Sequence, residues 1–177
     1  MPANNLLIRP CATADLPAVA AIYADSVRRG TGSFELEPPD LVEMQRRFAD
    51  QQARNLPWLA AESAGTVLGY AYAAPFRPRP AYRFAVENSV YVAEAGRGRG
   101  VGRALLAELI ARCEATGARQ MVAVIGDSAN IESIALHAAQ GFVRSGLVAN
   151  VGWKFGRWLD VVMMQRALGP GHHTPAP

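Results

Sequence analysis

Glycine and arginine alternate in a short stretch that leads directly into an apolar helix pattern. The stretch is GRGRGVGR, residues 96–103, and it follows a strand-like segment. Glycines let backbone N–H groups approach an anion closely, and the N-terminus of the next helix adds a partial positive charge of about half an elementary unit. These residue types in this order predict a site for a pyrophosphate group.

Two familiar phosphate-binding motifs do not fit this spacing. A dinucleotide-binding turn needs G-x-G-x-x-G, but the sixth residue counted from Gly98 is Arg103, and no glycine is followed by the Lys and Ser or Thr of a P-loop. An ordinary tight turn is the plain alternative. Such a turn needs only one or two glycines, whereas Gly100 and Gly102 inside a first helical turn would each cost about 0.5–1 kcal/mol.

The order Arg97-x-x-Gly100-x-Gly102 resembles the acyl-CoA signature, (Arg or Gln)-x-x-Gly-x-(Gly or Ala), of the GNAT superfamily of N-acetyltransferases. The segments VENSVYV before it and NIESIALHAAQGF after it extend the resemblance. The segments TGSFE, PFRPRPAYRFAVENSVYV and VGWKFGRWLDVVMMQ are similar to the branch of phosphinothricin and methionine sulfoximine N-acetyltransferases. The resemblance implies an α/β GNAT fold, with a mixed and mostly antiparallel central sheet of about seven strands flanked by about four helices.

The resemblance also implies acetyl-CoA as co-substrate, no metal, and a set of residues that bind the co-substrate. That set is Val90, Tyr91, Val92, Arg97, Gly98, Arg99, Gly100, Val101, Gly102, Arg103, Asn130 and Ser133. A backbone N–H in 90–92 would stabilise the oxygen that becomes negative as an amine attacks the thioester. The plain alternatives are strand core for 90–92 and a simple helix N-cap for Asn130.

Two side chains are expected to move protons. Glu87 matches an acidic position of this branch, and a carboxylate near the amine can collect the proton that a free alkylammonium, with a pKa near 10, must lose. His137 stands where many relatives have a tyrosine that protonates the leaving thiolate. An imidazole there can donate a proton, hydrogen-bond the sulfur or only pack. A solvated glutamate and a structural histidine are the competing interpretations.

The resemblance places substrate selection in Phe34, Arg77, Arg79, Tyr82 and Lys154. Arginine presents a planar fork that suits a carboxylate or phosphinate, and a lysine adds a point charge. These residues predict a small anionic amino acid or analogue as the acceptor, acetylated on its α-amine by direct attack. A solvated Arg- and Pro-rich loop is the alternative for residues 77–83.

Periodicity predicts the elements that position these residues. Strands are expected at 6–10, 57–63, 66–76, 84–93, 119–126, 142–151 and 157–168, and helices at 13–30, 40–48, 101–110 and 130–140. Thr13 and Asp40 are expected to cap the first two helices. Residues 1–169 are expected to form a single domain, and the Gly- and Pro-rich tail, 170–177, to be disordered.

Composition limits the cellular compartment and the classes of partner expected for the protein. The 177 residues carry a formal charge of only +3 and two cysteines, so neither a polycation nor a disulfide framework is indicated. We expect a cytoplasmic protein without nucleic-acid or membrane partners, and a homodimer, as the resemblance implies. Acetylation of another amine (a polyamine or a protein N-terminus), a non-catalytic CoA-binding regulatory module and nucleic-acid binding through the arginines remain alternative functions.

Overall fold

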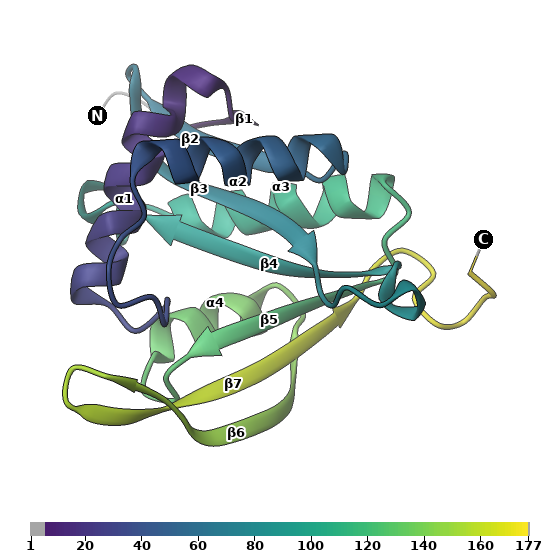
Figure 1. The fold of residues 1–177 in the computed structure, drawn as a ribbon. Helices are drawn as coiled ribbons and strands as arrows, with labels where there is room; N and C mark the ends of the chain where they lie inside the picture. Colours follow the sequence, from purple (N-terminus) through teal and green to yellow (C-terminus); the bar gives the residue numbers. More distant parts are fainter. Residues whose placement is uncertain (1–5, 177) are drawn as a thin grey trace.

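The computed structural model describes residues 6–176 and contains both strands and helices (Figure 1). The strands are β1 (Leu7–Pro10), β2 (Trp58–Ser63), β3 (Thr66–Pro75), β4 (Ala85–Val92), β5 (Gln120–Gly126), β6 (Val143–Lys154) and β7 (Arg157–Ala167). The helices are α1 (Leu16–Arg29), α2 (Leu41–Ala53), α3 (Val101–Ala115) and α4 (Ile131–Ala139). This order confirms the α/β fold with seven strands and four helices expected from the sequence.

The strands form one sheet in the order β1-β2-β3-β4-β5-β7-β6. The pair β4 and β5 is parallel, and the other neighbouring pairs are antiparallel. A parallel pair needs a crossover connection, and α3 supplies it between β4 and β5. The glycine-rich stretch therefore lies where the chain leaves the central strand of the sheet.

Helices cover both faces of the sheet. On one face α1 and α2 pack against an aromatic cluster that includes Trp58 and Tyr70, whereas α3 and α4 cover the other face with aliphatic side chains such as Leu105 and Leu109. Trp58, Tyr70 and Tyr72 stack in parallel, which broadens the apolar surface under α1 and α2. The central part of the sheet is therefore a layer between two pairs of helices.

The helix starts differ in one respect from the sequence expectation. Asp40 caps α2 as expected, because its carboxylate accepts the N–H of Glu43 at 2.8 Å. The expectation that Thr13 caps the first helix is wrong: Thr13–Asp15 is a 3₁₀ turn, and α1 begins at Leu16. The physical reason is Asp15, whose carboxylate accepts the N–H of Ala12 at 2.8 Å and so tightens the chain before the helix.

Residues 170–176 form turns that contact Arg119, and the expectation that 170–177 are disordered stays a prediction. The guanidinium of Arg119 donates to the carbonyls of Gly171 and Pro175 and to the hydroxyl of Thr174, each at 3.0 Å. Leu168, just before this segment, is fully buried. Arg119 therefore ties the tail to the start of β5, an arrangement that composition does not reveal.

Candidate active site

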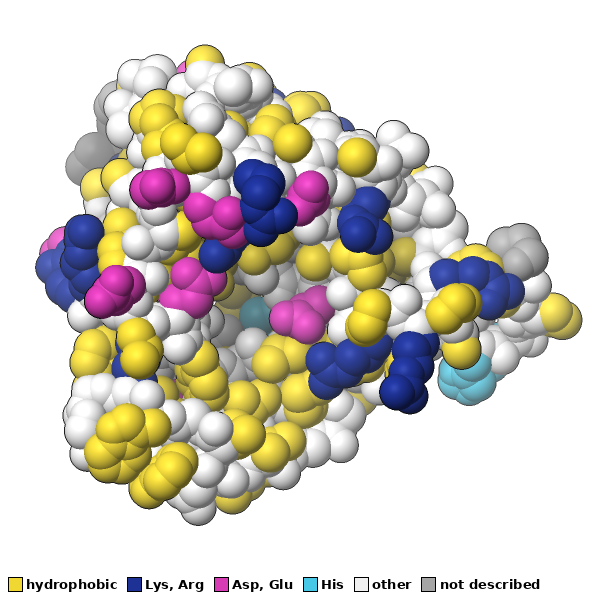
Figure 2. Space-filling model, in the orientation of Figure 1, with side chains coloured by type: hydrophobic (Ala, Val, Ile, Leu, Met, Phe, Trp, Pro, Cys, Tyr) yellow, Lys and Arg dark blue, Asp and Glu magenta, His cyan; other side chains and the backbone are white. Residues whose placement is uncertain are grey.

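Strands β4 and β5 separate in the middle of the sheet. Their register runs from Ala85↔Gln120 to Asn88↔Ala123, after which β4 continues to Val92 and β5 to Gly126. Figure 1 shows the two ribbons diverging toward the side of α1. A cavity of about 860 Å³ fills the space between them, and Figure 2 shows a hollow in this region with charged side chains at its rim.

The cavity is lined from both faces of the sheet. Its walls include Ile22 and Ser26 of α1, residues 88–92 of β4, residues 123–126 of β5, and Leu136 and His137 of α4. A ligand in this cavity therefore reaches through the sheet. A long, flexible molecule can enter from one face while a second reactant approaches from the other.

The glycine-rich turn forms one end of the cavity. Gly98 and Gly100 have φ values of +68° and +78°, and Gly100 is the N-cap of α3. Among residues 6–176, no atom lies within 4 Å of the place where a Cβ on either glycine would stand. The first N–H groups of a helix have no partner inside the helix. The turn therefore offers open space, free donors and the positive helix end to an anion, which fits a pyrophosphate.

Most residues expected to contact acetyl-CoA do line this cavity. They are Val90, Tyr91, Val92, Arg97, Gly98, Gly100, Val101, Gly102, Arg103, Asn130 and Ser133. Arg99 is outside the lining set, and its guanidinium donates to the carbonyl of Ala95 at 3.2 Å. Asn130 also caps α4 by accepting the N–H of Ser133 at 3.2 Å, so it serves the helix as well as the cavity wall.

His137 is buried in the wall of the cavity and bonded at both ring nitrogens. Its Nδ1 lies 2.7 Å from the carbonyl oxygen of Ser133, and its Nε2 lies 2.9 Å from Oδ1 of Asn88. Phe142 contacts the ring edge to face. Burial lowers the pKa of His137, and the hydrogen bond to the Ser133 carbonyl acts in the opposite direction. The imidazole is therefore held in a fixed orientation beside the separating strands.

Glu87 sits at the apex of the separation, on the face covered by α1 and α2. It pairs with Ala74 of β3 and Val122 of β5, and the strand alternation puts its side chain opposite those of Val90 and Val92. Burial raises the pKa of Glu87 above its ordinary value, and the charge of Arg77 partly opposes this shift. Glu87 is thus a half-buried carboxylate with an increased affinity for protons.

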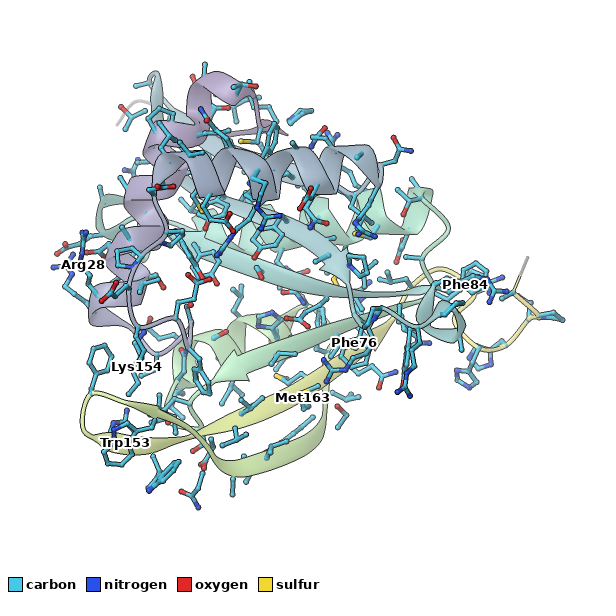
Figure 3. The ribbon with its side chains drawn as sticks, viewed as in Figure 1. Arg28, Phe76, Phe84, Trp153, Lys154 and Met163 are labelled. Carbon is cyan, nitrogen blue, oxygen red and sulfur yellow. The ribbon has the colours of Figure 1, made fainter. Side chains whose placement is uncertain are left out.

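The residues expected to select the substrate fall into two separate groups. Arg77, Arg79 and Tyr82 belong to the loop between β3 and β4, where Arg77 and Tyr82 both contact the ring of Phe76. Phe34 and Lys154 lie near the turn between β6 and β7. Figure 3 shows Phe76 and Lys154 at opposite sides of the hollow. The structure therefore does not bring all five residues together.

Lys154 and Phe34 support the segment between α1 and α2. The buried ammonium of Lys154 donates to the carbonyls of Gly30 and Ser33 at 3.0 and 2.7 Å, and burial lowers its pKa. Phe34 packs so closely on Gly126 and Gly152 that a methyl group at either glycine would overlap its ring. Residues 30–32 line the cavity, so these contacts hold one of its walls.

Sequence reasoning missed two polar residues of the cavity wall. Asn88 is buried and binds His137, and its signal in the sequence is an amide among the valines of the inward-facing alternation in β4. Asp127 follows β5 with φ of +78°, accepts the N–H of Ala129 at 3.1 Å and pairs with Arg157. Burial of Asp127 would raise its pKa, but the Ala129 and Arg157 hydrogen bonds outweigh it and lower the pKa.

Residues 6–176 contain no group of three or more His, Cys, Asp or Glu side chains placed to hold a metal ion. The helices of this range are too short or too polar for any of them to span a bilayer.

The fold and this cavity define an acyl-CoA-dependent transferase, and comparison with known proteins gives the same class. The model of the Acetyltransferase (GNAT) family matches residues 19–142. The chain belongs to this family and is an acetyl-CoA-dependent N-acetyltransferase.

Similar proteins share almost the whole chain. A phosphinothricin N-acetyltransferase of Alcaligenes faecalis is 56% identical over 160 residues, covering 90% of this chain and 81% of the relative. An L-methionine sulfoximine/L-methionine sulfone acetyltransferase of Pseudomonas aeruginosa is 44% identical over 169 residues, covering 95% and 98%. The crystal structure of a phosphinothricin acetyltransferase from Sinorhizobium meliloti in complex with acetyl-CoA superposes with a TM-score of 0.94 at 46% identity, covering 97% of this chain and 93% of that one.

Replacing Gly100 by alanine should weaken acetyl-CoA binding. A side chain at φ of +78° strains the backbone by about 1–2 kcal/mol, and relief of that strain turns the N–H groups of the first helical turn away from the anion. We expect the Kd measured by calorimetry to rise about tenfold. The matched control is Gly65→Ala, which has the same φ in the β2–β3 turn and should lose stability without losing affinity. Equal affinity of both variants and the wild type would contradict the pyrophosphate cradle.

Proposed function

We propose that the protein transfers the acetyl group of acetyl-CoA to the α-amine of a small amino acid or analogue of the phosphinothricin or methionine sulfoximine type. The observation that carries this proposal is the cavity that passes through the sheet, with the pyrophosphate turn at one end. Glu87 is not among the lining residues, but it lies one residue before the last paired residue of β4, on the sheet face covered by α1 and α2. The names of relatives that share 44–56% of aligned residues support the same substrate class.

Acetyl-CoA supplies an activated acyl group, and the protein's residues supply position and proton transfer. The new bond joins the amine nitrogen to the acetyl carbon, and the bond from that carbon to sulfur breaks. The backbone N–H groups of Val90 and Val92 face the gap between β4 and β5, because the alternate residue Ala93 donates its N–H to Leu68 of β3. These two groups can donate to the oxygen that becomes negative during attack. One such donor is typically worth about 2.7–4 kcal/mol.

Glu87 is proposed as the base that collects the amine proton. An alkylammonium with a pKa near 10 is mostly protonated at neutral pH, so a neighbouring carboxylate must accept its proton before attack. Burial raises the pKa of Glu87 and brings its proton affinity closer to that required at neutral pH. His137, on the α4 side, is proposed to supply the proton that the leaving sulfur receives.

The acceptor is proposed to bind with its negative group toward the loop between β3 and β4. Arg77 lies close enough to Glu87 to influence its ionisation, and Arg79 and Tyr82 belong to the same loop. An α-amino acid with a carboxylate or phosphinate places an amine and an anion a few bonds apart, which matches a carboxylate base beside an arginine. Phe34 and Lys154 contribute by holding residues 30–34 in place.

Release of free thiol from acetyl-CoA tests the substrate class. We expect release with phosphinothricin, methionine sulfoximine or a related α-amino acid, and background release with a polyamine or an alanine-terminated peptide. The N-acetyl product should be identified by mass spectrometry. Release with the polyamine or the peptide alone would overturn the substrate assignment.

Glu87→Gln should lower turnover at neutral pH by about a hundredfold or more. The deficit in turnover should shrink at high pH, because the amine then loses its proton to water.

The same Glu87→Gln change should raise the midpoint of thermal unfolding at neutral pH. Because the pKa of Glu87 is raised in the folded state, its contribution to the free energy of unfolding is full below the unfolded pKa. This contribution is lost as pH rises through the folded pKa. Gln has no such loss.

Activity at several pH values and thermal unfolding should be measured on the same samples. Glu108→Gln, on the outer surface of α3, is the matched control and should change neither. A pH profile of Glu87→Gln parallel to that of the wild type would exclude Glu87 as the base.

We further propose that the protein is a homodimer joined through β6 and β7. Strand β6 is the last strand of the sheet, and the hairpin exposes large apolar side chains: Val143, Leu147, Val148, Val151, Trp153, Phe155 and Trp158 are each 47–68% exposed. Figure 3 shows Trp153 pointing away from the body. A patch of this kind on an edge strand usually marks an interface. A two-fold axis lets the same patch cover itself.

Val148→Glu should convert the dimer to a monomer. A two-fold axis near this strand brings two copies of the new carboxylate into one apolar interface, where each loses solvation. Analytical ultracentrifugation should show half the mass. Val42→Glu, on the exposed face of α2 at 72% exposure, is the control and should remain dimeric. A monomeric wild type at micromolar concentration would rule out the proposed interface.

The proposed cytoplasmic setting rests on the two cysteines. Cys11 and Cys113 are both unpaired and buried, and burial raises the pKa of each thiol to about 12. Thiols of this kind are stable in a reducing compartment and react poorly.

A further inference from the structure

His137 touches a hydrogen-bond acceptor with each of its ring nitrogens. Nδ1 lies 2.7 Å from the Ser133 carbonyl oxygen, which can only accept. Nε2 lies 2.9 Å from Oδ1 of Asn88, which can also only accept. Both side chains are buried, with exposed fractions of 4% for His137 and 6% for Asn88. Both contacts are hydrogen bonds only when each ring nitrogen of His137 carries a proton.

The orientation of the Asn88 amide is fixed by a second contact. Its Nδ2 donates to the carbonyl oxygen of Val122 on β5 at 3.1 Å. A rotation of the amide by 180° would bring Oδ1 against that carbonyl, so two acceptors would meet in a buried place. Asn88 is also the last residue of β4 in register with β5. Its side chain therefore links the two strands where they begin to separate, and it presents an oxygen to His137.

Only one protonation state satisfies all three contacts. A neutral imidazole protonated at Nδ1 turns the Nε2 lone pair toward Asn88 Oδ1, and one protonated at Nε2 turns the Nδ1 lone pair toward the Ser133 carbonyl. The hydroxyl of Ser133, at 3.5 Å from Nδ1, is a poor substitute donor. The imidazolium donates to both oxygens.

We propose that Asn88 is a positioning residue that fixes Nε2 of His137 as a hydrogen-bond donor at the point where β4 and β5 separate. The inference rests on the proposed function, because it identifies the atom from which the leaving sulfur takes its proton. It adds a residue, Asn88, that touches the histidine and belongs to the wall of the cavity.

The proton balance of the step follows from this arrangement. The sulfur takes the Nε2 proton, which leaves its hydrogen bond to Asn88 Oδ1, the N–H electron pair stays on the ring, and His137 becomes neutral. Its Nε2 lone pair then faces Asn88 Oδ1, an unfavourable contact that a proton from water removes. Glu87 returns the proton collected from the ammonium to water, and the second proton that the nitrogen loses as the amide forms also passes to water. Water therefore receives two protons and supplies one to His137. The sum is one ammonium and one thioester giving one amide, one thiol and one proton.

Other titratable side chains lie on the elements around His137. On the elements next to His137, the titratable side chains that line the cavity are Arg103 of α3, Asp127 after β5, Glu132 of α4 and Arg157 of β7. Glu87 of β4 lies outside this lining. The shift in the pKa of His137 has two causes, burial, which lowers it, and the Ser133 carbonyl, which raises it. A contact that favours the imidazolium at Nε2 therefore counters the burial.

The ionisation of His137 in Asn88 variants tests the inference without reference to activity. The imidazole signals should be followed by NMR from about pH 5 to 9, with His137 identified by the signal lost in His137→Gln. Asn88→Leu removes the acceptor and should lower the pKa of His137 by about one pH unit, whereas Asn88→Asp supplies a charged acceptor and should raise it by a similar amount. Asn55→Asp adds the same charge at the exposed end of α2 and should leave the pKa unchanged.

The positioning role is supported if the pKa of His137 is highest in Asn88→Asp, intermediate in the wild type and lowest in Asn88→Leu. An unchanged or higher pKa in Asn88→Leu would overturn it, and if that variant does not fold, an unchanged or lower pKa in Asn88→Asp does the same. Acetyl-CoA binding and circular dichroism verify that each variant is folded.

The pH dependence of turnover then separates this inference from the proposed acid role. If the imidazolium protonates the sulfur, the falling limb at high pH should move down in Asn88→Leu and up in Asn88→Asp, and neither change should move it in a His137→Gln background. The falling limb of the pH profile could stay the same in the Asn88 variants while their His137 pKa values keep the expected order. That result would overturn the acid role of His137 and leave the positioning role of Asn88 intact.

Discussion

The separation of β4 from β5 is the constraint on which the rest of the structure depends. Beyond Asn88↔Ala123 the backbone groups of β4 that face β5 have left the sheet ladder, although they remain inside the protein. Buried backbone N–H and C=O groups require partners, so an opening of this kind in the middle of a sheet is stable only where another molecule or polar side chains meet those groups. The opening is thus both a structural cost and a binding site.

Three elements hold the opening in its shape. The glycine-rich turn and α3 form one end, α4 closes the side with Asn130 and His137, and residues 30–32 form the wall next to α1. Each is fixed by short-range contacts of a different kind: a left-handed N-cap at Gly100, the His137 to Asn88 hydrogen bond, and the Lys154 ammonium on two carbonyls. None of these three contacts involves a ligand, so each can support its part of the cavity wall in the free protein.

The sequence predicted the elements better than the contacts between them. Strand alternation and helical periodicity depend on neighbours along the chain, so β4, α3 and the glycine turn were predictable. Residues 97–103 line the cavity as expected, with the exception of Arg99. Lys154 shows the limit. Its charge suggested a substrate contact, but its ammonium lies on carbonyls of a segment more than a hundred residues earlier, and no local pattern encodes such a pairing. Asn88 was missed because a single amide in a strand indicates a role only once its contacts with His137 and Val122 are known.

The β6–β7 hairpin connects the proposed interface to the cavity. Its outer side carries the exposed apolar residues, and at the turn Lys154 and Arg157 point back to the body, where they hold Ser33 and Asp127. Asp160 adds a bond of 2.6 Å to the hydroxyl of Ser128, next to the start of α4. A hairpin at a sheet edge would ordinarily be free to bend, whereas these polar contacts couple its position to both walls of the cavity. Burial of the outer side in the proposed dimer would therefore restrain the same walls of the cavity.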